Sequence, residues 1–458
     1  MNNLREKLLH RNSSNNQLLN TDKRNMFMEQ SMTTNSMKFN QSHFLELSTR
    51  IGMDQNKISN ENSQIYLHND EGISSFRIFM MIIKGYCAMV ILILPKSFEN
   101  GGYIASPATL IISGFASTVC ALKLAQVGVK TGIYDFSEVG GLAMGRIGKI
   151  TIDLMLCFTY FTFLTSNMTF VYENAKDLYE HYFSRDDSVF VAGFLITIVY
   201  FFLIQQLDLK KFSFAFVLGS TILLIVCVKM IIYCMVIISK EGVGEDIKAI
   251  DSNNFWGALG FSIYVYEGIG CIMPILKISK NPKQFYRMLI YAVTALVITY
   301  TVFGVICYLA FGNKLTEPIV LQMLPSDNIL TIFIKIIFCL QLLCSYPLYS
   351  TLVTNIAESY IFHPRFVKQY DYRRVLFRGL QVIIGVVMAI IFAKKLDKFF
   401  SVLGALLCAP IVFILPTLCH LYLVAETKAE ILTDKAIIVV AFFIQIFCTY
   451  QALLSWDS

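Results

Sequence analysis

Charged residues are scarce in this sequence. Asp, Glu, Lys and Arg together make up 15% of its 458 residues, whereas 55% of the residues are hydrophobic. Soluble globular domains carry about 25% charged residues, and here apolar runs recur from residue 74 to residue 454 with no soluble interval between them. The scarcity of charge excludes an ordinary soluble protein and indicates an integral membrane protein with one membrane domain.

The sequence also lacks the motifs that mark enzymes and metal sites. It contains no Gly-rich phosphate loop, no H-E-x-x-H and no nucleophile elbow, and His68, His363 and His420 are too scattered for a metal cluster. Its twelve cysteines lie in or beside apolar segments without a C-x-x-C pair, so we interpret them as packing residues. We therefore expect neither enzyme activity nor a bound cofactor.

The positive charge is modest and dispersed. The net charge is +6, and most lysines and arginines lie between hydrophobic segments rather than in one patch. This distribution argues against a nucleic acid partner. The lipid bilayer is the partner that the composition predicts.

The N-terminal region differs from the rest of the chain. Residues 1–72 are rich in Asn, Ser and Gln and have no sustained apolar period, so they cannot bury enough surface to offset the entropy of ordering. We predict a disordered cytosolic tail over 1–72 and a transmembrane domain over 73–458. The tail lacks a basic segment followed by a compact apolar stretch, so we expect no cleavable signal peptide, and the first span must act as the targeting signal.

The apolar runs predict eleven membrane crossings, with about 20 residues needed for each crossing. The expected fold class is an all-α integral membrane protein. We place the spans at 74–98, 104–127, 149–174, 188–206, 213–238, 254–277, 286–311, 328–360, 373–393, 397–422 and 434–454.

The positions of Lys and Arg predict the orientation of the chain. With a cytosolic N-terminus, sixteen of these residues fall on inside loops and span ends and eight fall outside. This bias favours a cytosolic N-terminus by the positive-inside rule. The odd number of spans then places Ser458 on the opposite side.

Two of the spans are interrupted by glycine and proline, within Ile82 to Gly102 and within Phe255 to Pro282. A helix break inside the bilayer leaves backbone N–H and C=O groups without hydrogen-bond partners. Such a break therefore persists only where protein or a water-filled cavity supplies those partners. The interrupted spans are the first and the sixth, so spans one to five and spans six to ten each begin with a broken segment. Matching breaks of this kind indicate a five-plus-five inverted repeat with a binding site near the middle of the membrane. Close helix packing, for which glycine is also used, is the other interpretation of either break.

The interrupted segments resemble a known family. The first carries Lys84, Gly85, Leu92, Leu94 and Pro95, which match the K-G-x-x-G-x-G-x-L-x-L-P pattern of the amino acid/auxin permease family, and Ala88 and Val90 stand where that pattern has glycine. The second reads Tyr266-Glu267-Gly268-Ile269-Gly270-Cys271-Ile272-Met273-Pro274, which is similar to the family's aromatic-Glu-Gly-Ile-Gly-x-x-x-P stretch. The resemblance covers about residues 74 to 454 and implies a LeuT-like fold.

The resemblance implies an amino acid substrate held between the two breaks. The N-terminus of a half-helix offers free N–H groups and partial positive charge to a carboxylate, and the opposing carbonyls suit an ammonium group. The substrate-binding candidates are Gly85, Cys87, Ala88, Met89, Val90, Tyr160, Tyr266, Glu267, Gly268 and Gly270. Because Ala88 and Val90 fill space, we expect small neutral amino acids to be preferred over bulky ones.

Glu267 is the first candidate for an ion-coupling or gating residue, because ionised carboxylates are costly inside a membrane. A structural carboxyl that is protonated or bonded to nearby backbone is an equally good interpretation. For Lys84, reaching the interface or holding broken backbone is the safer interpretation than substrate binding. Hydroxyls on Ser345, Ser350 and Thr351 suit either sodium ligation or helix packing, so we expect a proton as the coupling ion, with sodium as the alternative.

The residues therefore predict a secondary active amino acid transporter, with proton-coupled symport by alternating access. One alternative is a sensing membrane protein that binds an amino acid with little transport. A second is a channel or structural membrane subunit in which both breaks serve packing. A plasma membrane and a lysosomal or vacuolar membrane both fit the sequence, and no protein partner is predicted.

Overall fold

The computed structural model describes residues 74–87, 89–183, 187–205, 213–251, 254–279, 281–324, 329–362 and 371–454. The predicted tail over 1–72 and the site candidate Ala88 lie outside these ranges. Within them every regular element is a helix, which confirms the predicted all-α fold class.

Some of the main helices exceed the roughly 20 residues that cross a bilayer, and others are shorter. They are α3 (Ser75–Tyr86), α4 (Leu94–Gly101), α5 (Ala105–Thr131), α6 (Phe136–Phe183), α7 (Ser188–Ile204), α8 (Ser213–Glu241), α9 (Phe255–Val265), α10 (Ile269–Ile278), α11 (Pro282–Phe311), α12 (Ile329–Ile361), α13 (Tyr372–Phe392), α14 (Leu396–Leu403), α15 (Leu415–Leu423) and α16 (Lys428–Leu454). Short turns complete them, including η1 (Met89–Leu92) after α3 and the π-helical η6 (Gly404–Cys408) and η7 (Pro410–Ile414) between α14 and α15.

Each of the eleven predicted spans has a counterpart among these helices. Among the described residues, eight helical stretches are long and apolar enough to cross a membrane, and one of them, Tyr372–Leu423, joins two of the predicted spans. The shorter α7 and the interrupted first span supply the others.

The third span begins earlier than its apolar run. Helix α6 starts at Phe136, whereas the predicted span starts at residue 149, because Gly145 adopts φ 71° and lets two helical pieces join across a kink. Only glycine adopts such a backbone conformation readily. Gly145 therefore serves as a bend between two helical pieces.

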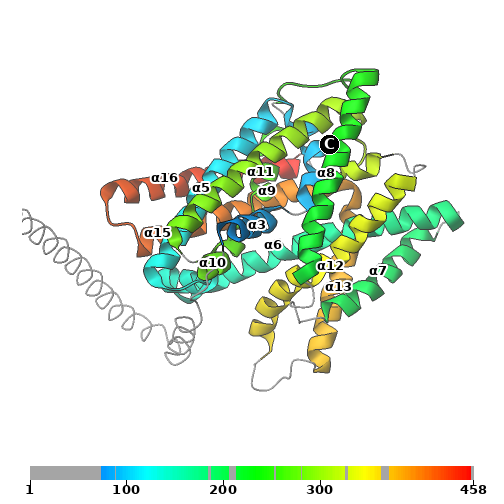
Figure 1. Ribbon diagram of the computed structural model, residues 1–458. Coiled ribbons are helices and arrows are strands. Elements are labelled where there is room, and N and C mark those ends of the chain that lie inside the picture. The colour runs from blue at the N-terminus through cyan, green and yellow to red at the C-terminus, as the bar shows by residue number, and fades with distance from the viewer. Residues whose placement is uncertain are drawn as a thin grey trace, which may run out of the picture. The chain divides into compact units, whose positions relative to one another are not determined.

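Helix contacts repeat between the two halves of the chain, and the helices concerned are labelled in Figure 1. Helix α3 packs on α11, and α9, which stands five spans later, packs on α5. In the same way α8 packs on α11 while α15 packs on α5, and α13 packs on α6 while α7 packs on α12. This exchange of partners is what a five-plus-five repeat predicts, and the odd number of spans in each half gives the halves opposite orientations.

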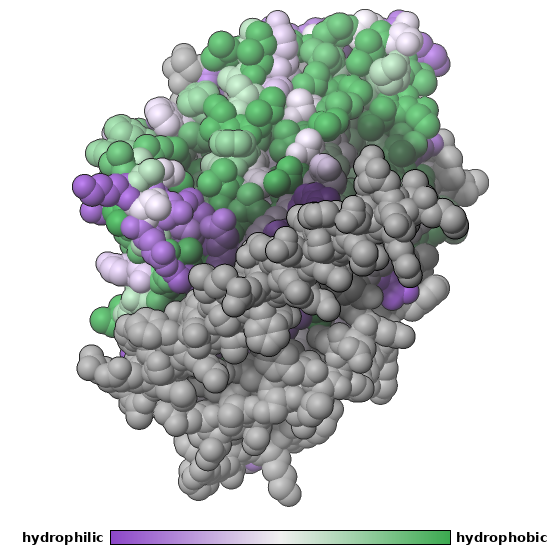
Figure 2. Space-filling view, turned by 60° about the vertical axis from the view of Figure 1, so that its left-hand side comes forward, coloured by the Kyte–Doolittle hydropathy of each residue, from purple (hydrophilic) through white to green (hydrophobic). Residues whose placement is uncertain are grey.

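The outward helix faces are apolar. Large side chains such as Phe115, Phe190 and Leu376 are each more than 70% exposed. Figure 2 shows hydrophobic residues over most of the described part of one face, with hydrophilic residues gathered in a smaller patch. A soluble protein rarely exposes so much apolar surface, so these faces are suited to lipid.

Candidate functional site

The first interruption lies between α3 and α4. Helix α3 ends at Tyr86, and Cys87 follows in an extended conformation with φ −94° and ψ 95°. The chain resumes as the turn η1 and then as α4, with Pro95 in its first turn. The hydroxyl of Tyr300 on α11 donates to the carbonyl of Tyr86 at 3.2 Å, so protein receives one of the backbone groups at the break.

The second interruption lies between α9 and α10. Tyr266 and Glu267 follow the end of α9, and Gly268 precedes α10. Ser117 on α5 donates its hydroxyl to the Tyr266 carbonyl at 3.2 Å, and the Cys271 thiol donates to the Gly268 carbonyl at 2.8 Å. Both breaks are therefore stabilised by side chains from neighbouring turns and helices.

The glycines at the breaks allow close packing. A Cβ on Gly85 would collide with the Cys271 sulfur, and a Cβ on Gly268 would lie 2.5 Å from the Tyr86 ring. A Cβ on Gly270 would collide with the Tyr160 hydroxyl. The two breaks thus pack directly against each other, and side chains at these positions would force them apart.

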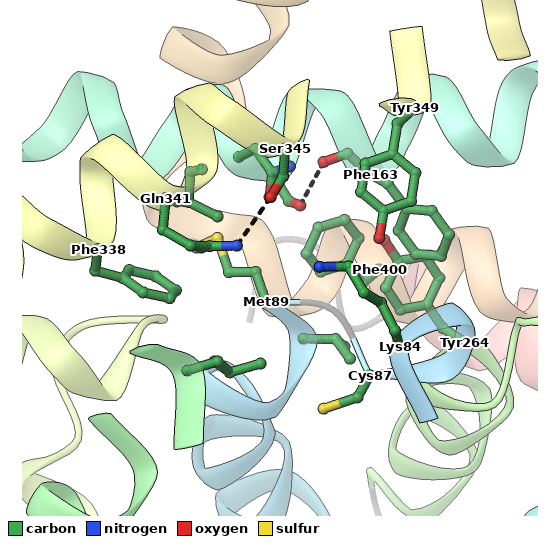
Figure 3. A pocket seen from close by; sticks show the side chains of 15 residues that line it. Lys84, Cys87, Met89, Phe163, Tyr264, Phe338, Gln341, Ser345, Tyr349 and Phe400 are labelled. Atoms are coloured by element: carbon green, nitrogen blue, oxygen red, sulfur yellow. Dashed lines mark hydrogen bonds between the residues drawn. The ribbon is translucent and has the colours of Figure 1, made fainter. Parts of the chain in front are cut away.

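A pocket lies beside the first break, between α3, α6 and α12 (Figure 3). Its lining comes from both halves of the chain and consists of Lys84, Cys87, Met89, Val90, Phe163, Ser166, Asn167, Leu223, Tyr264, Phe338, Gln341, Leu342, Ser345, Tyr349 and Phe400. The cavity has a volume of about 40 Å³, and roughly 10–15 Å³ is enough for one water molecule. In this conformation it has room for a few waters, and a larger occupant requires side-chain movement.

The polar groups of the lining are complementary to a zwitterion. Lys84 is the one charged residue among the described lining residues, and its ammonium extends toward the middle of the pocket (Figure 3). The amide nitrogen of Gln341 donates to the Ser345 hydroxyl at 2.9 Å. The buried Gln341 Oε1 has no hydrogen-bond partner within the described part of the chain, so it is an acceptor that awaits a donor.

Aromatic rings form one wall of the pocket. Tyr264 stacks on Phe400 with ring centroids 4.5 Å apart, and Phe163 lies 5.3 Å from Tyr264 and 6.2 Å from Tyr349. Tyr160, which does not line the pocket, stacks on Tyr349 with ring centroids 6.5 Å apart. The layer limits the width of the cavity.

Glu267 does not line the pocket. It is 1% exposed, and neither of its carboxyl oxygens has a hydrogen-bond partner among the described residues. It is near enough to Tyr160, Tyr264 and Tyr349 to interact with them electrostatically. An ionised carboxylate without partners is costly in such surroundings.

The structure separates the predicted site residues into two groups. Cys87, Met89 and Val90 line the pocket. The packed positions Gly85, Gly268 and Gly270, together with Tyr160 and Glu267, lie outside its lining. Tyr266 points away toward α5 and α11, where its ring lies 5.9 Å from that of Tyr300 and close to Gly114.

Several lining residues are not among the sequence-based candidates. The sequence predicts that Lys84 reaches the interface or holds broken backbone, whereas the structure places it in the lining. The α12 residues Phe338, Gln341 and Tyr349 carry no family motif. One sequence signal is available for α12, because Gln341 and Ser345 are polar residues four apart in an apolar helix and so share a face. No local sequence pattern identifies Leu223 or Phe400 as pocket residues.

Similar proteins are known in fungi and plants. Vacuolar amino acid transporter 3 of Saccharomyces cerevisiae is 25% identical over 84% of this chain and 57% of its own length. Amino acid transporter AVT3B of Arabidopsis thaliana is 21% identical over 76% of this chain and 85% of its own length. The chain spans about 60% of the length of its fungal relatives.

Solved transporter structures share the fold. The manganese transporter of Eremococcus coleocola gives a TM-score of 0.53 at 13% identity, covering 82% of this chain and 85% of that one. MhsT in complex with L-phenylalanine gives a TM-score of 0.52 at 9% identity, covering 83% of this chain and 99% of that one. These similarities confirm the expected LeuT-like fold.

The family itself is shown by a match that covers most of the chain. Residues 71–454 match the family model described as "Transmembrane amino acid transporter protein". This range includes both interrupted helices and the whole pocket lining. The chain therefore belongs to the transmembrane amino acid transporter family.

Proposed function

We propose that the protein is a secondary active transporter that moves small neutral amino acids by alternating access, with a proton as the coupling ion. The observation that carries the proposal is that one pocket beside a broken helix contains both the Lys84 side chain and the Gln341 oxygen, which has no hydrogen-bond partner among the described residues. The names of the fungal and plant relatives support an amino acid as substrate.

The pocket polarity favours a specific orientation of the substrate. The substrate carboxylate faces the Lys84 ammonium, since a charge-assisted hydrogen bond is about twice as strong as a neutral one. The substrate ammonium donates to Gln341 Oε1, which is buried and lacks a donor. A cationic side chain would meet Lys84 without a compensating carboxylate in the described lining, so lysine and arginine are poor substrates.

The pocket walls favour a small side chain. Met89 and Val90 fill the side of the pocket next to the break, and the aromatic layer of Phe163, Tyr264 and Phe400 closes another side. Alanine and similar substrates need the least displacement of these groups. Uptake of tryptophan at the same rate as alanine would refute this part of the proposal.

Glu267 is the proposed proton-binding residue. Its burial without partners favours the neutral acid, and exposure to water or to a cation during the transport cycle would allow the proton to leave. The aromatic layer next to Glu267 also lines the pocket, through Tyr264 and Tyr349. Contact with the substrate and protonation of Glu267 therefore both affect Tyr264 and Tyr349.

The hydroxyls of α12 give less support to sodium. Ser350 and Thr351 both donate to the carbonyl of Pro347, at 3.3 and 2.6 Å. Such bonds to the preceding turn of the same helix are typical of Ser and Thr within helices and require no bound ion. Sodium remains the alternative ion in the uptake experiment below.

We further propose that the protein acts in a vacuolar or lysosomal type of membrane, with its N-terminus in the cytosol. The printed names of three fungal relatives contain the word vacuolar. The excess of Lys and Arg on the loops assigned to the inside supports the orientation. Fluorescence microscopy with organelle markers and protease protection of a tagged N-terminus test these two statements.

The decisive experiment uses the purified chain in liposomes. Uptake of a panel of labelled amino acids is measured with and without an inward proton gradient, first without sodium and then with sodium added. Uptake of small neutral amino acids that rises with the proton gradient is the expected result. Thermal stabilisation by an amino acid without any uptake would instead favour a sensor, and absence of both binding and uptake would favour a structural subunit.

The coupling role of Glu267 is tested by Glu267→Gln, which keeps the shape of the side chain but removes its proton exchange. We expect substrate exchange across the liposome membrane to persist while the stimulation by a proton gradient is lost. A variant that keeps the full pH dependence of uptake would assign Glu267 a structural role.

A further inference from the structure

A buried cluster of charged and polar side chains joins three helices away from the substrate pocket. Lys123 and Gln126 lie on α5, His420 on α15 and Asp434 on α16. One carboxylate oxygen of Asp434 lies 2.7 Å from the Lys123 ammonium, and the other lies 2.7 Å from His420 Nδ1. His420 Nε2 lies 3.1 Å from the Oε1 of Gln126.

The cluster is the polar part of the attachment of α16. This helix buries only a narrow stripe, made of Asp434, Ala441, Cys448 and Ala452. Asp434 is fully buried and His420 is 2% exposed. Charges are buried at such positions only when they are paired, so the contacts of Asp434 join α16 to α15 and α5.

The imidazole faces an oxygen atom on each side. Neutral histidine has one N–H donor and one acceptor nitrogen, whereas the imidazolium has two donors. The arrangement in the structure, with Asp434 at Nδ1 and Gln126 Oε1 at Nε2, satisfies the imidazolium fully. The neutral ring would keep its bond to Asp434 but would require the Gln126 amide to turn and present its nitrogen.

One of the two ring nitrogens has a path to the surface. Gln126 is exposed, so Nε2 faces a side chain at the molecular surface, while Nδ1 faces the buried Asp434. Proton exchange is therefore possible at Nε2. Histidine is also the side chain whose ordinary titration falls between about pH 5 and pH 8.

The charged groups around the ring set the cost of protonation. Lys123 on α5 repels an added charge, and Asp434 on α16 attracts it. Glu430, in the first turn of α16, interacts electrostatically with His420 and also favours the charged ring. Lys130 at the end of α5 is paired with Glu426.

We propose that His420 is a second proton-binding site, distinct from Glu267, and that its protonation strengthens the link between α5 and the α15–α16 pair. Protonation makes the bond to Gln126 charge-assisted and removes the need for the amide to turn. Helix α5 also packs on α9 and α10, which form the second broken helix. Protonation of His420 therefore acts, through α5, on the helices around the second break.

The test measures thermal unfolding of the full chain in detergent at about pH 5.5 and about pH 7.5, on either side of the histidine range. We expect the wild-type melting temperature to fall by about 2–4 °C more over this step than that of His420→Gln. Glu267→Gln, which removes the other proton site, should reduce the difference independently of His420, because a buried neutral carboxyl also loses stability as the pH rises. An unchanged difference in His420→Gln would overturn the proposal.

A second pair of variants covers the case in which His420→Gln does not fold. Gln126→Leu changes an exposed residue and removes the acceptor at Nε2, so it should shrink the pH-dependent difference. Gln445→Leu on α16 is the matched control, since its amide donates to the Leu406 carbonyl at 3.4 Å and lies outside the His420 cluster. Equal pH responses of Gln126→Leu and Gln445→Leu would also refute the proposal. Neither measurement depends on transport, so both remain informative if the proposed function is wrong.

Discussion

At the scale of the residue, the site depends on one cation and on three glycines. Lys84 brings the charge into the pocket, and Gly85, Gly268 and Gly270 let the two breaks approach each other. The family-like glycines thus have a packing role in this structure, and the polar contacts of the pocket come from other side chains. Two predictions separate these roles.

Replacement of Lys84 by methionine should weaken substrate binding and leave the fold intact. Loss of one charge-assisted hydrogen bond corresponds to about a tenfold to hundredfold rise in KM for uptake of neutral amino acids. Lys229→Met is the matched control, because Lys229 also lies in a membrane helix but outside the pocket lining. Equal KM values for the two variants would remove Lys84 from the binding site.

Replacement of Gly268 by alanine should destabilise the protein. The new Cβ would lie 2.5 Å from the Tyr86 ring, which is itself fully buried, and overpacking of this kind costs about 1–3 kcal/mol. Gly257→Ala on α9 is the control, since a Cβ there meets nothing within 4 Å. A lower melting temperature for Gly268→Ala alone would confirm the packing role.

At the scale of the element, a helix can break inside the membrane only when other elements receive the freed backbone groups. In this protein Tyr300 on α11 and Ser117 on α5 donate to carbonyls at the two breaks. Helices α11 and α5 are repeat counterparts of each other, so the two breaks are stabilised in equivalent ways.

The hydroxyl of Tyr300 should therefore contribute to stability out of proportion to its size. Tyr300→Phe leaves the Tyr86 carbonyl without this donor, which should cost about 1–3 kcal/mol. Tyr291→Phe on the same helix is the control, because Tyr291 is 58% exposed. The unfolding temperatures of both variants are measured in the same detergent. Equal values for Tyr300→Phe and Tyr291→Phe would show that the Tyr300 hydroxyl does not stabilise the break.

At the scale of the whole molecule, one end of the helix bundle is closed by contacts around α4. Lys96 donates to the Leu315 carbonyl at 2.5 Å, and Asn100 donates to a carboxylate oxygen of Asp397 at 3.3 Å. The backbone N–H of Asp251 donates to the Gly101 carbonyl at 3.1 Å. The alternating access proposed above would require these contacts to separate in each cycle.

A covalent bridge at this end should stop transport. Asn100→Cys and Asp397→Cys combined, treated with a short thiol cross-linker, should lose uptake, because α4 and α14 can no longer separate. The single-cysteine variants and the wild type, treated in the same way, control for the native cysteines. Full uptake by the cross-linked double variant would show that this end stays closed during transport.

Much of the architecture follows from the sequence alone. The scarcity of charge and the lengths of the apolar runs predict a helical membrane protein, because the bilayer accepts little else. Gly85, Pro95 and Gly268 lie at or next to the two breaks, whereas Pro274 lies inside α10. Glycine and proline are the residues that interrupt helices most readily. These signals are local along the chain.

The contents of the pocket depend on tertiary structure. Lys84, Gln341 and Phe400 are far apart in the sequence and meet only because helices from both halves pack together. The same packing turns Tyr266 toward α11 and joins His420 to Asp434 and Gln126. The sequence by itself determined the number of membrane spans and the breaks in the first and sixth of them. The packing of helices decided which side chains share a cavity, because such contacts join residues that no local pattern relates.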